Sequence, residues 1–331
     1  MNVLFCSVGR RCELLKDFRK TLGDKVKLVV TDNSPYAPAL EFADVSYQVP
    51  LIKDPAYIPM ILEICKKEQI DAITTLIDPE IAILAEHRAQ FEALGITVLA
   101  PDKETAALCF DKYEMSKYLV SKGIPTVLTY GSFAEFQAAY KEGSIKLPVF
   151  VKPRTGSGSV GARRIDTFEM LEEITTSDPS LIIQELMTGI DMDADIYVDT
   201  ISHEPVAIFA KKKLSTTIGG ANKTISFKDD KLFDFVKKAL DVLVFHGPLD
   251  MDLFYQDGQY YLSEINPRFG GAYLHAYGAG VDFPAFIYHN VKGKSPNNDC
   301  IGQYEEDVVM MMYDSVVIKK LSEIRVEKLG E

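Results

Sequence analysis

Oxygen-bearing side chains gather in two neighbouring segments of the C-terminal half of the sequence. Glu264 and Asn266 are two residues apart in a run that alternates like a β-strand, so their side chains share one face. An Asp-Gly turn joins this run to the preceding one, where Asp252 can lie opposite them. Two carboxylates and an amide oxygen on one face suit Mg²⁺ or Mn²⁺. Arg268 would bring a guanidinium group to the same region, and the alternative is an exposed face with a Glu264–Arg268 surface pair.

A glycine-rich stretch lies earlier in the chain. Gly156, Gly158 and Gly161 fit the G-x-G-x-x-G pattern of dinucleotide-binding proteins, but that pattern requires the glycines to open a helix. Here both flanking runs favour strands, which predicts a hairpin whose backbone N–H groups close over phosphates. Lys152, at the end of the incoming strand, can reach those phosphates as a point charge. The alternative is a hairpin with solvated basic residues.

Two further charged segments leave their roles open. Asp191, Asp193 and Asp195 alternate along a predicted strand, where a carboxylate can accept hydrogen bonds from ribose hydroxyls or simply face solvent. The triplet Lys211–Lys213 follows the apolar run Pro205–Ala210. Alternate lysines of such a triplet would add two cations to one strand face, whereas the simpler interpretation is a hydrated surface.

The N-terminal hundred residues predict the framework beside these side chains. Short β-branched runs alternate with segments of helical period from Val3 to Ala100, which indicates βαβ units and a parallel sheet. The carboxyl ends of such strands share one edge, where ligand sites are favoured. At this edge Ser7–Arg11 can hold an anion or form a solvated turn, and Asp78 and Glu80 can contact substrate or act as helix N-terminal charges.

The overall composition excludes several classes of protein. The 331 residues carry a net charge of −12, which argues against nucleic acid as the main partner. Apolar runs fall short of the roughly 20 residues that span a bilayer, and the N-terminal segment lacks the order of a signal peptide. The five cysteines are scattered, which argues against a disulfide framework or a zinc site. We therefore expect a cytoplasmic protein of two domains, or one with subdomains.

Taken in order, four sequence motifs resemble the ATP-grasp superfamily, and within it the carbamoyl-phosphate synthase large-subunit type. They are Lys112, Val-Phe-Val-Lys152 with Gly-Ser-Gly-Ser-x-Gly, Gln-Glu-Leu-Met with Gly-x-Asp191, and Glu-x-Asn-Pro-Arg. The resemblance implies an α/β and α+β architecture, in which a Rossmann-like parallel-sheet pre-ATP-grasp domain precedes a two-lobed ATP-grasp fold. The implied parts are a pre-ATP-grasp domain over 1–105, a small lobe over 106–190, a C-terminal lobe over 191–295, and a tail packing on the core over 296–331.

The resemblance also implies the residues that would hold ATP and a metal ion between the lobes. The phosphates would contact Lys112, Lys152 and the loop residues Gly156, Ser157, Gly158, Ser159 and Gly161, with Lys211 or Lys213 facing them. Adenine would contact Gln184, the Glu185 carbonyl and the Met187 amide, and the ribose would contact Asp191. The metal, Mg²⁺ or Mn²⁺, would be held by Asp252, Glu264 and Asn266, with Arg268 beside the transferred phosphoryl group.

The activity that the resemblance implies is carboxylate activation. ATP would phosphorylate a small-molecule carboxylate, and an amine or ammonia would attack the acyl phosphate. The carbamoyl-phosphate synthase type uses two fused cores and a glutaminase partner, whereas this chain has one core. Two rivals remain at this point, a non-catalytic nucleotide-binding module and a dehydrogenase that uses NAD. A homodimer is an assembly that the sequence leaves open.

Overall fold

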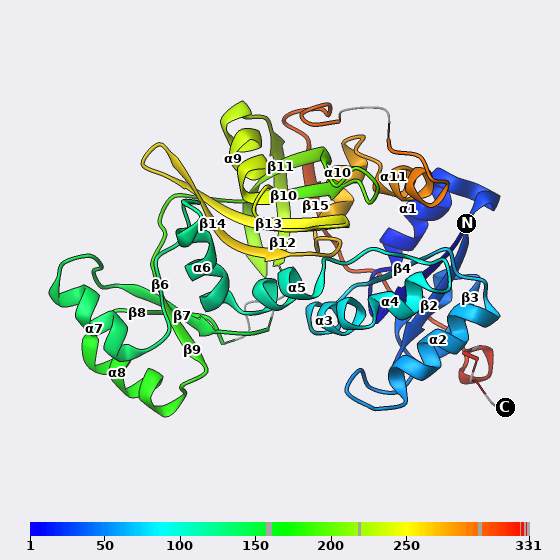
Figure 1. Ribbon diagram of the computed structural model, residues 1–331, viewed down its shortest axis with the longest axis horizontal. Coiled ribbons are helices and arrows are strands. Elements are labelled where there is room, and N and C mark those ends of the chain that lie inside the picture. Colours follow the sequence, from blue (N-terminus) through cyan, green and yellow to red (C-terminus); the bar gives the residue numbers. More distant parts are fainter. Residues whose placement is uncertain (157–160, 218–219, 297–299, 325, 328, 330–331) are drawn as a thin grey trace.

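Three β-sheets organise the chain (Figure 1). The computed structural model describes residues 1–156, 161–217, 220–296, 300–324, 326–327 and 329. A parallel sheet lies at one end of the molecule and a small antiparallel sheet at the other, with a large antiparallel sheet between them. Among the described residues, no helix combines the length and apolar character needed to cross a membrane.

The N-terminal sheet is parallel, with strand order β3-β2-β1-β4-β5. Its strands are β1 (Asn2–Cys6), β2 (Lys27–Asp32), β3 (Val45–Gln48), β4 (Ala72–Thr75) and β5 (Thr97–Val98). Its helices are α1 (Cys12–Leu22), α2 (Tyr57–Lys67), α3 (Asp78–Glu86) and α4 (Arg88–Glu92). Side chains from the two faces of β1 pack into different apolar clusters, as expected where helices cover both faces of a parallel sheet. The predicted Rossmann-like domain is confirmed.

Two local differences separate this domain from the sequence prediction. The four-residue strand β3 was not expected, because a run this short carries little periodic signal. The apolar spacing of the sequence predicts a helix over Ile81–Leu94, but the helix begins earlier, at Asp78, with a proline in its first turn. It is also divided at His87, where α3 ends and α4 begins.

The small antiparallel sheet has strand order β6-β9-β7-β8. Its strands are β6 (Thr129–Tyr130), β7 (Val149–Pro153), β8 (Arg163–Ile165) and β9 (Leu181–Glu185), packed with α7 (Phe133–Lys141) and α8 (Phe168–Ser177). β7 pairs with β8 in antiparallel register, so the stretch after the last glycine of the loop continues as a strand. The predicted hairpin is therefore confirmed at both of its flanking strands.

The large sheet is antiparallel in the order β14-β13-β10-β11-β12-β15. Its strands are β10 (Ile190–Val198), β11 (Pro205–Thr217), β12 (Gly220–Phe227), β13 (Gly247–Gln256), β14 (Gln259–Asn266) and β15 (Val309–Met311). The other helices of this region are α9 (Asp230–Leu240), α10 (Tyr273–Gly278) and α11 (Phe283–Val291), and α5 (Lys103–Phe110) and α6 (Lys112–Ser121) connect the N-terminal domain to the small lobe. The triplet Lys211–Lys213 lies within β11, because the strand continues beyond the apolar run Pro205–Ala210.

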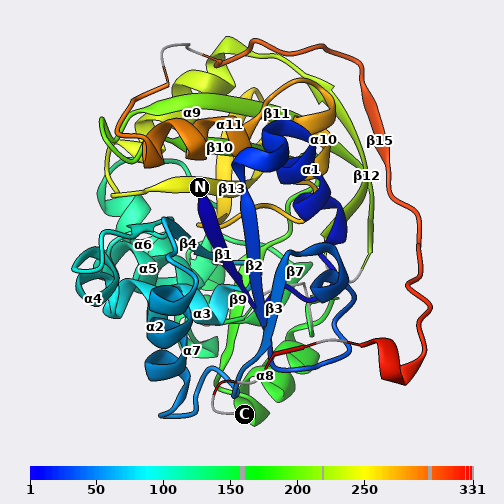
Figure 2. The same ribbon diagram turned by 90° about the vertical axis from the view of Figure 1, so that its right-hand side faces the viewer.

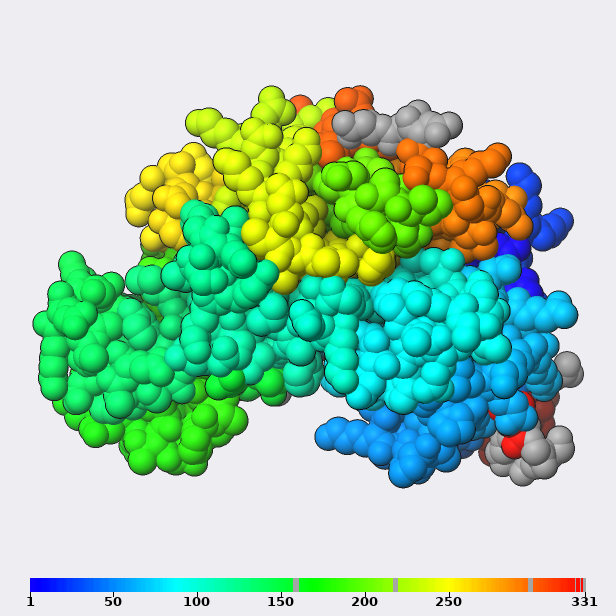
Figure 3. Space-filling view, in the orientation of Figure 1, coloured from blue at the N-terminus to red at the C-terminus, as the bar shows by residue number. Residues whose placement is uncertain are grey.

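The N-terminal domain and the large sheet share one apolar core. The ring of Phe18 on α1 lies 6.0 Å from that of Phe269, which follows β14. The small lobe and the N-terminal domain project from the large sheet with a notch between them (Figure 3). After residue 300 the chain adds β15 to the sheet and then runs down one side of the molecule to the N-terminal domain (Figure 2). The predicted domain boundaries remain predictions.

Candidate functional site

A cleft of about 820 Å³ lies between the small lobe and the large sheet. Both sheets line it, through β7 and β9 on one side and β10, β11, β13 and β14 on the other. Most of the side chains singled out from the sequence line this one cavity: Lys112, Lys152, Gly156, Gln184, Glu185, Met187, Asp191, Lys213, Asp252, Glu264, Asn266 and Arg268. Gly161 and Lys211 do not line it, and Ser157, Gly158 and Ser159 lie outside the described residues.

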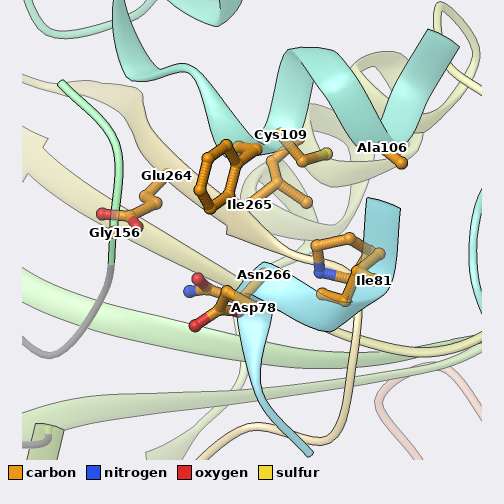
Figure 4. Close-up of a pocket in the computed structure, with 10 residues that line it drawn as sticks. Asp78, Ile81, Ala106, Cys109, Gly156, Glu264, Ile265 and Asn266 are labelled. Atoms are coloured by element: carbon orange, nitrogen blue, oxygen red, sulfur yellow. The ribbon is translucent and has the colours of Figure 1, made fainter. Parts of the chain in front are cut away.

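The oxygen-bearing side chains meet through the register of two antiparallel strands. β13 pairs with β14 so that Asp252 lies opposite Glu264, and Asp250 lies opposite Asn266. The Asn266 Nδ2 donates a hydrogen bond to Asp252 Oδ2 at 3.1 Å. Figure 4 shows Glu264 directed toward the chain at Gly156, beside a smaller hollow between α3, α5 and β14. The strand pairing expected from the sequence therefore brings the three predicted metal ligands to one wall.

The three side chains at this wall offer the oxygen atoms that Mg²⁺ prefers, but they are fewer than the ligands of its octahedral shell. In the described part of the chain, no group of three or more His, Cys, Asp or Glu side chains is arranged to hold a metal ion. Asp252, Glu264 and Asn266 supply only oxygen ligands, which Mg²⁺ prefers, and this ion keeps other oxygens in its shell. Phosphate oxygens of a nucleotide in the cleft would complete such a shell.

Two lysines from the small-lobe side face the same glutamate. The Nζ of Lys112 lies 3.3 Å from Glu264 Oε1, and the Nζ of Lys152 lies 3.8 Å from Glu264 Oε2. Lys112 also donates a hydrogen bond to the carbonyl of Gly156. Burial lowers the pKa of Lys152, and the Glu264 carboxylate opposes that effect. Two ammonium groups against one carboxylate leave a local excess of positive charge, which favours an anion such as phosphate.

Lys213 lies among three carboxylates on the large sheet. Its Nζ is 2.9 Å from Asp191 Oδ1, 2.7 Å from Asp193 Oδ1 and 2.5 Å from Asp252 Oδ1. Burial opposes the charged lysine, but the carboxylates outweigh it and raise its pKa. Although burial acts in the opposite direction, Lys213 holds the pKa of Asp252 below its ordinary value. Through these ion pairs Lys213 connects Asp191, the predicted ribose contact, with Asp252, one of the predicted metal ligands.

Lys211 points along the same face of β11 but lies deeper in the protein. It is fully buried and forms ion pairs with Asp195 and, at 3.8 Å, with Asp250. Burial works against its charge, but these two carboxylates keep the pKa of Lys211 above its ordinary value. Of the two lysines expected to face the phosphates, only Lys213 lines the cleft. Lys211 instead pairs with the buried carboxylates of Asp195 and Asp250.

We expect Lys211→Met to lower the free energy of unfolding by about 3–5 kcal/mol, because Asp195 would remain buried without its cation. Urea denaturation measures this, with Lys212→Met as the matched control, since Lys212 points to the other face and stacks on Phe227. Adding Asp195→Asn to Lys211→Met should recover part of the loss. Equal unfolding free energies for Lys211→Met and Lys212→Met would contradict the buried pair.

Arg268 connects the cleft to the N-terminal domain. Its guanidinium binds Asp78 through two contacts, Nε to Oδ1 at 2.8 Å and Nη2 to Oδ2 at 2.9 Å. Asp78 and Glu80 both lie in the first turn of α3, as the interpretation of helix N-terminal charges expects, and Glu80 is buried against Thr75 and Tyr57. The N-terminal domain thereby orients the guanidinium that lines the cleft.

The anion loop considered at Ser7–Arg11 has other partners. The Gly9 amide donates to Asp32 Oδ2 at 2.8 Å, and Arg11 donates to the carbonyl of Gly270 at 2.7 Å. Burial lowers the pKa of Arg11 to about 10. Both groups therefore hold the chain together at this edge, and the solvated-turn interpretation is wrong for Arg11.

The other end of the cleft has an apolar wall. Phe150, Phe254 and Leu186 line it beside the predicted adenine residues Gln184 and Glu185. A flat base would pack between such side chains while the chain edge supplies hydrogen bonds. The sequence analysis missed both phenylalanines, because an apolar residue on a strand gives no signal of which cavity it lines. Asp250 was given no role either, although its alternation with Asp252 along the strand was a visible signal.

Comparisons with known families and proteins agree with this geometry. Residues 3–99 match the family described as PylC-like, N-terminal domain, and residues 109–272 match the family described as ATP-grasp domain. The chain belongs to the ATP-grasp superfamily. Its ATP-grasp match ends just beyond Arg268 and so includes every predicted ligand residue of the cleft.

Individual relatives of this ATP-grasp chain are distant in sequence. D-alanine–D-alanine ligase of Mycobacterium avium is 24% identical over 234 residues, covering 59% of this chain and 62% of the relative. The chain thus spans less than two thirds of that relative's length. The structure of N5-carboxyaminoimidazole synthetase from Staphylococcus aureus complexed with ADP matches with a TM-score of 0.73 at 17% identity, covering 90% of this chain and 78% of that one.

A second solved structure supports the same fold. L-amino acid ligase from Bacillus licheniformis matches with a TM-score of 0.66 at 18% identity, covering 88% of this chain and 73% of that one. These likenesses confirm the predicted pre-ATP-grasp domain followed by the two-lobed ATP-grasp fold.

Proposed function

We propose that the protein is an ATP-dependent ligase that activates a small-molecule carboxylate as an acyl phosphate for attack by an amine or ammonia. The observation that carries this proposal is the composition of one wall of the cleft. There Asp252, Glu264 and Asn266 lie within reach of Lys152 and Arg268. Phosphoryl transfer needs positioning and charge neutralisation more than covalent catalysis, and this wall supplies both.

Each group of residues has a role in this proposal. Lys112 and Lys152 bind the phosphates from the small lobe, while Gln184, Glu185 and Met187 hold the adenine and Asp191 the ribose. Asp252, Glu264 and Asn266 would hold Mg²⁺, which when bound would neutralise the negative charge of the phosphates. Arg268, oriented by Asp78, stabilises the phosphoryl group during transfer. Enclosure between the lobes would keep water from the acyl phosphate.

The two rival functions make different predictions. A dinucleotide fingerprint needs a helix after its last glycine, whereas β8 follows Gly161 here, so a dehydrogenase is not supported. A non-catalytic nucleotide-binding module would bind ATP but would never release ADP. The intact set of metal and phosphate residues in the cleft favours the enzyme over that module.

We expect ATP with Mg²⁺ to raise the melting temperature of the protein, because a ligand that binds only the folded state stabilises it by mass action. At about a hundredfold excess over its dissociation constant the gain is roughly 2.7 kcal/mol. NAD serves as the control and should leave the melting temperature unchanged. The same sample is then screened for ADP release with pairs of carboxylates and amines. Stabilisation by NAD alone would contradict the proposal, and ATP binding without ADP release under any pair would favour the module.

A further inference from the structure

The segment 312–320, here called the C-terminal strap, crosses the outside of the molecule between two anchors (Figure 2). At its start, the Met312 N–H donates to the carbonyl of Asn222 in β12 of the large sheet. At its end, Lys319 pairs with Glu41 of the N-terminal domain, and Glu327 forms a β-bridge with Tyr47. The strap is therefore held in place at both ends and is not a free tail.

The strap and its flanks carry the densest run of exposed apolar side chains in the described residues. Large side chains more than a third exposed follow one another here: Val309, Met311, Met312, Tyr313, Val316, Val317, Ile318 and Leu321. Apolar residues scattered singly on a surface are ordinary, whereas a continuous group marks an interaction site. Water exposure of this group in an isolated chain would be costly.

The backbone of the strap is also unpaired. Among the described residues, the N–H and C=O groups of 313–319 take part in no hydrogen bond. The strap continues β15, which is the edge strand of the large sheet. An unpaired edge segment with apolar side chains is a template for the addition of another strand.

The side-chain pattern of the strap points to what covers it. Val317 is 38% exposed and Lys319 contacts the body of the protein, whereas Val316 and Ile318 are 78% and 87% exposed. In an extended strap Asp314, Val316, Ile318 and Lys320 share one face, and Tyr313 on the opposite face is also 87% exposed. An antiparallel copy centred on Val317 sets Asp314 opposite the partner's Lys320 and Val316 opposite the partner's Ile318. The strap is therefore complementary to itself in both charge and apolar character.

We propose that the strap pairs antiparallel with the strap of a second copy of this chain and forms a two-fold symmetric dimer. Antiparallel pairing of identical segments satisfies both copies at once, which is the condition for a closed two-fold interface. It also hydrogen-bonds the backbone N–H and C=O groups of alternate residues between 313 and 319, and it brings apolar side chains such as Val316 and Ile318 into cross-strand contact. The strap residues lie outside the cleft, so this proposal is independent of the proposed function.

Sedimentation of the full chain over a range of concentrations tests the proposal, with a dimer as the expected result. The double variant Val316→Lys, Ile318→Lys should raise the dimer dissociation constant about tenfold or more, since each change acts twice across the two-fold axis. The matched control is Tyr36→Lys, Leu51→Lys, which changes two exposed side chains of the N-terminal domain. A monomer at every concentration, or a dimer that resists the strap variant, would overturn the proposal.

A charge exchange tests the antiparallel register. Asp314→Lys should weaken the dimer by placing two lysines opposite each other, and adding Lys320→Asp should restore it by reversing both partners. Failure of the second change to restore the dimer would refute the pairing centred on Val317. If the wild-type chain is monomeric and a different molecule protects residues 313–319 from hydrogen exchange, the occupant is not a second copy and the proposal fails.

Discussion

Glu264→Gln is expected to lower the rate of ADP release by about 10²–10³-fold while the protein remains folded. Glu264 combines two functions in the proposed site, since it faces Asp252 across the strand pair and neutralises Lys112 and Lys152. The amide keeps the size of the side chain but loses the negative charge that, in the proposed site, would hold Mg²⁺. Asn266→Ala should show a loss of the same kind. Both variants should also require more Mg²⁺ for half-maximal rate.

The controls for this prediction separate chemistry from folding. Glu172→Gln removes a carboxylate from the exposed side of α8 and should leave turnover unchanged. Glu264→Gln removes the carboxylate partner of Lys112 and Lys152. Its thermal melting is therefore measured in parallel, to show that the variant remains folded. Near-normal ADP release by both Glu264→Gln and Asn266→Ala would contradict the proposal that these two residues are metal ligands.

The second large effect is expected from Lys152→Met. Lys152 is one of two small-lobe lysines that face the predicted metal wall, and its side chain is only 12% exposed, so its removal should weaken ATP binding and slow phosphoryl transfer together. We expect a fall in kcat/KM for ATP of about 10²-fold, with KM raised and kcat lowered. Lys146→Met, on the exposed approach to the same strand, is the matched control. An unchanged ATP titration for Lys152→Met would make Lys152 a structural residue.

The sequence predicted the site most fully where strand alternation and turns act locally. Glu264 and Asn266 share a face because of the two-residue period, and the Asp-Gly turn brings Asp252 opposite Glu264. Asp111, directly before Lys112, is a typical N-cap residue in the sequence, and its side chain caps the helix that begins at Lys112. These features depend on residues close in sequence, so periodicity was sufficient to find them.

The features that could not be predicted from the sequence depend on how deeply a side chain is buried and on contacts between distant segments. Lys211 and Lys213 share one face of β11, but only their position along the strand decides which one reaches the cleft. The Arg268–Asp78 pair joins residues 190 positions apart. The exposed strap was taken simply as a tail on the core, because its apolar residues suggest burial until their surroundings are known.

Transfer of labelled oxygen tests the central claim most directly. The carboxylate that supports ADP release is prepared with ¹⁸O at both carboxyl oxygens, and the inorganic phosphate from one round of ligation is analysed by mass. An acyl phosphate forms by attack of a carboxylate oxygen on the γ-phosphorus, and amine attack then leaves that oxygen on phosphate. We predict one ¹⁸O atom in each phosphate released. Phosphate that carries no label while product forms would contradict carboxylate activation by this protein.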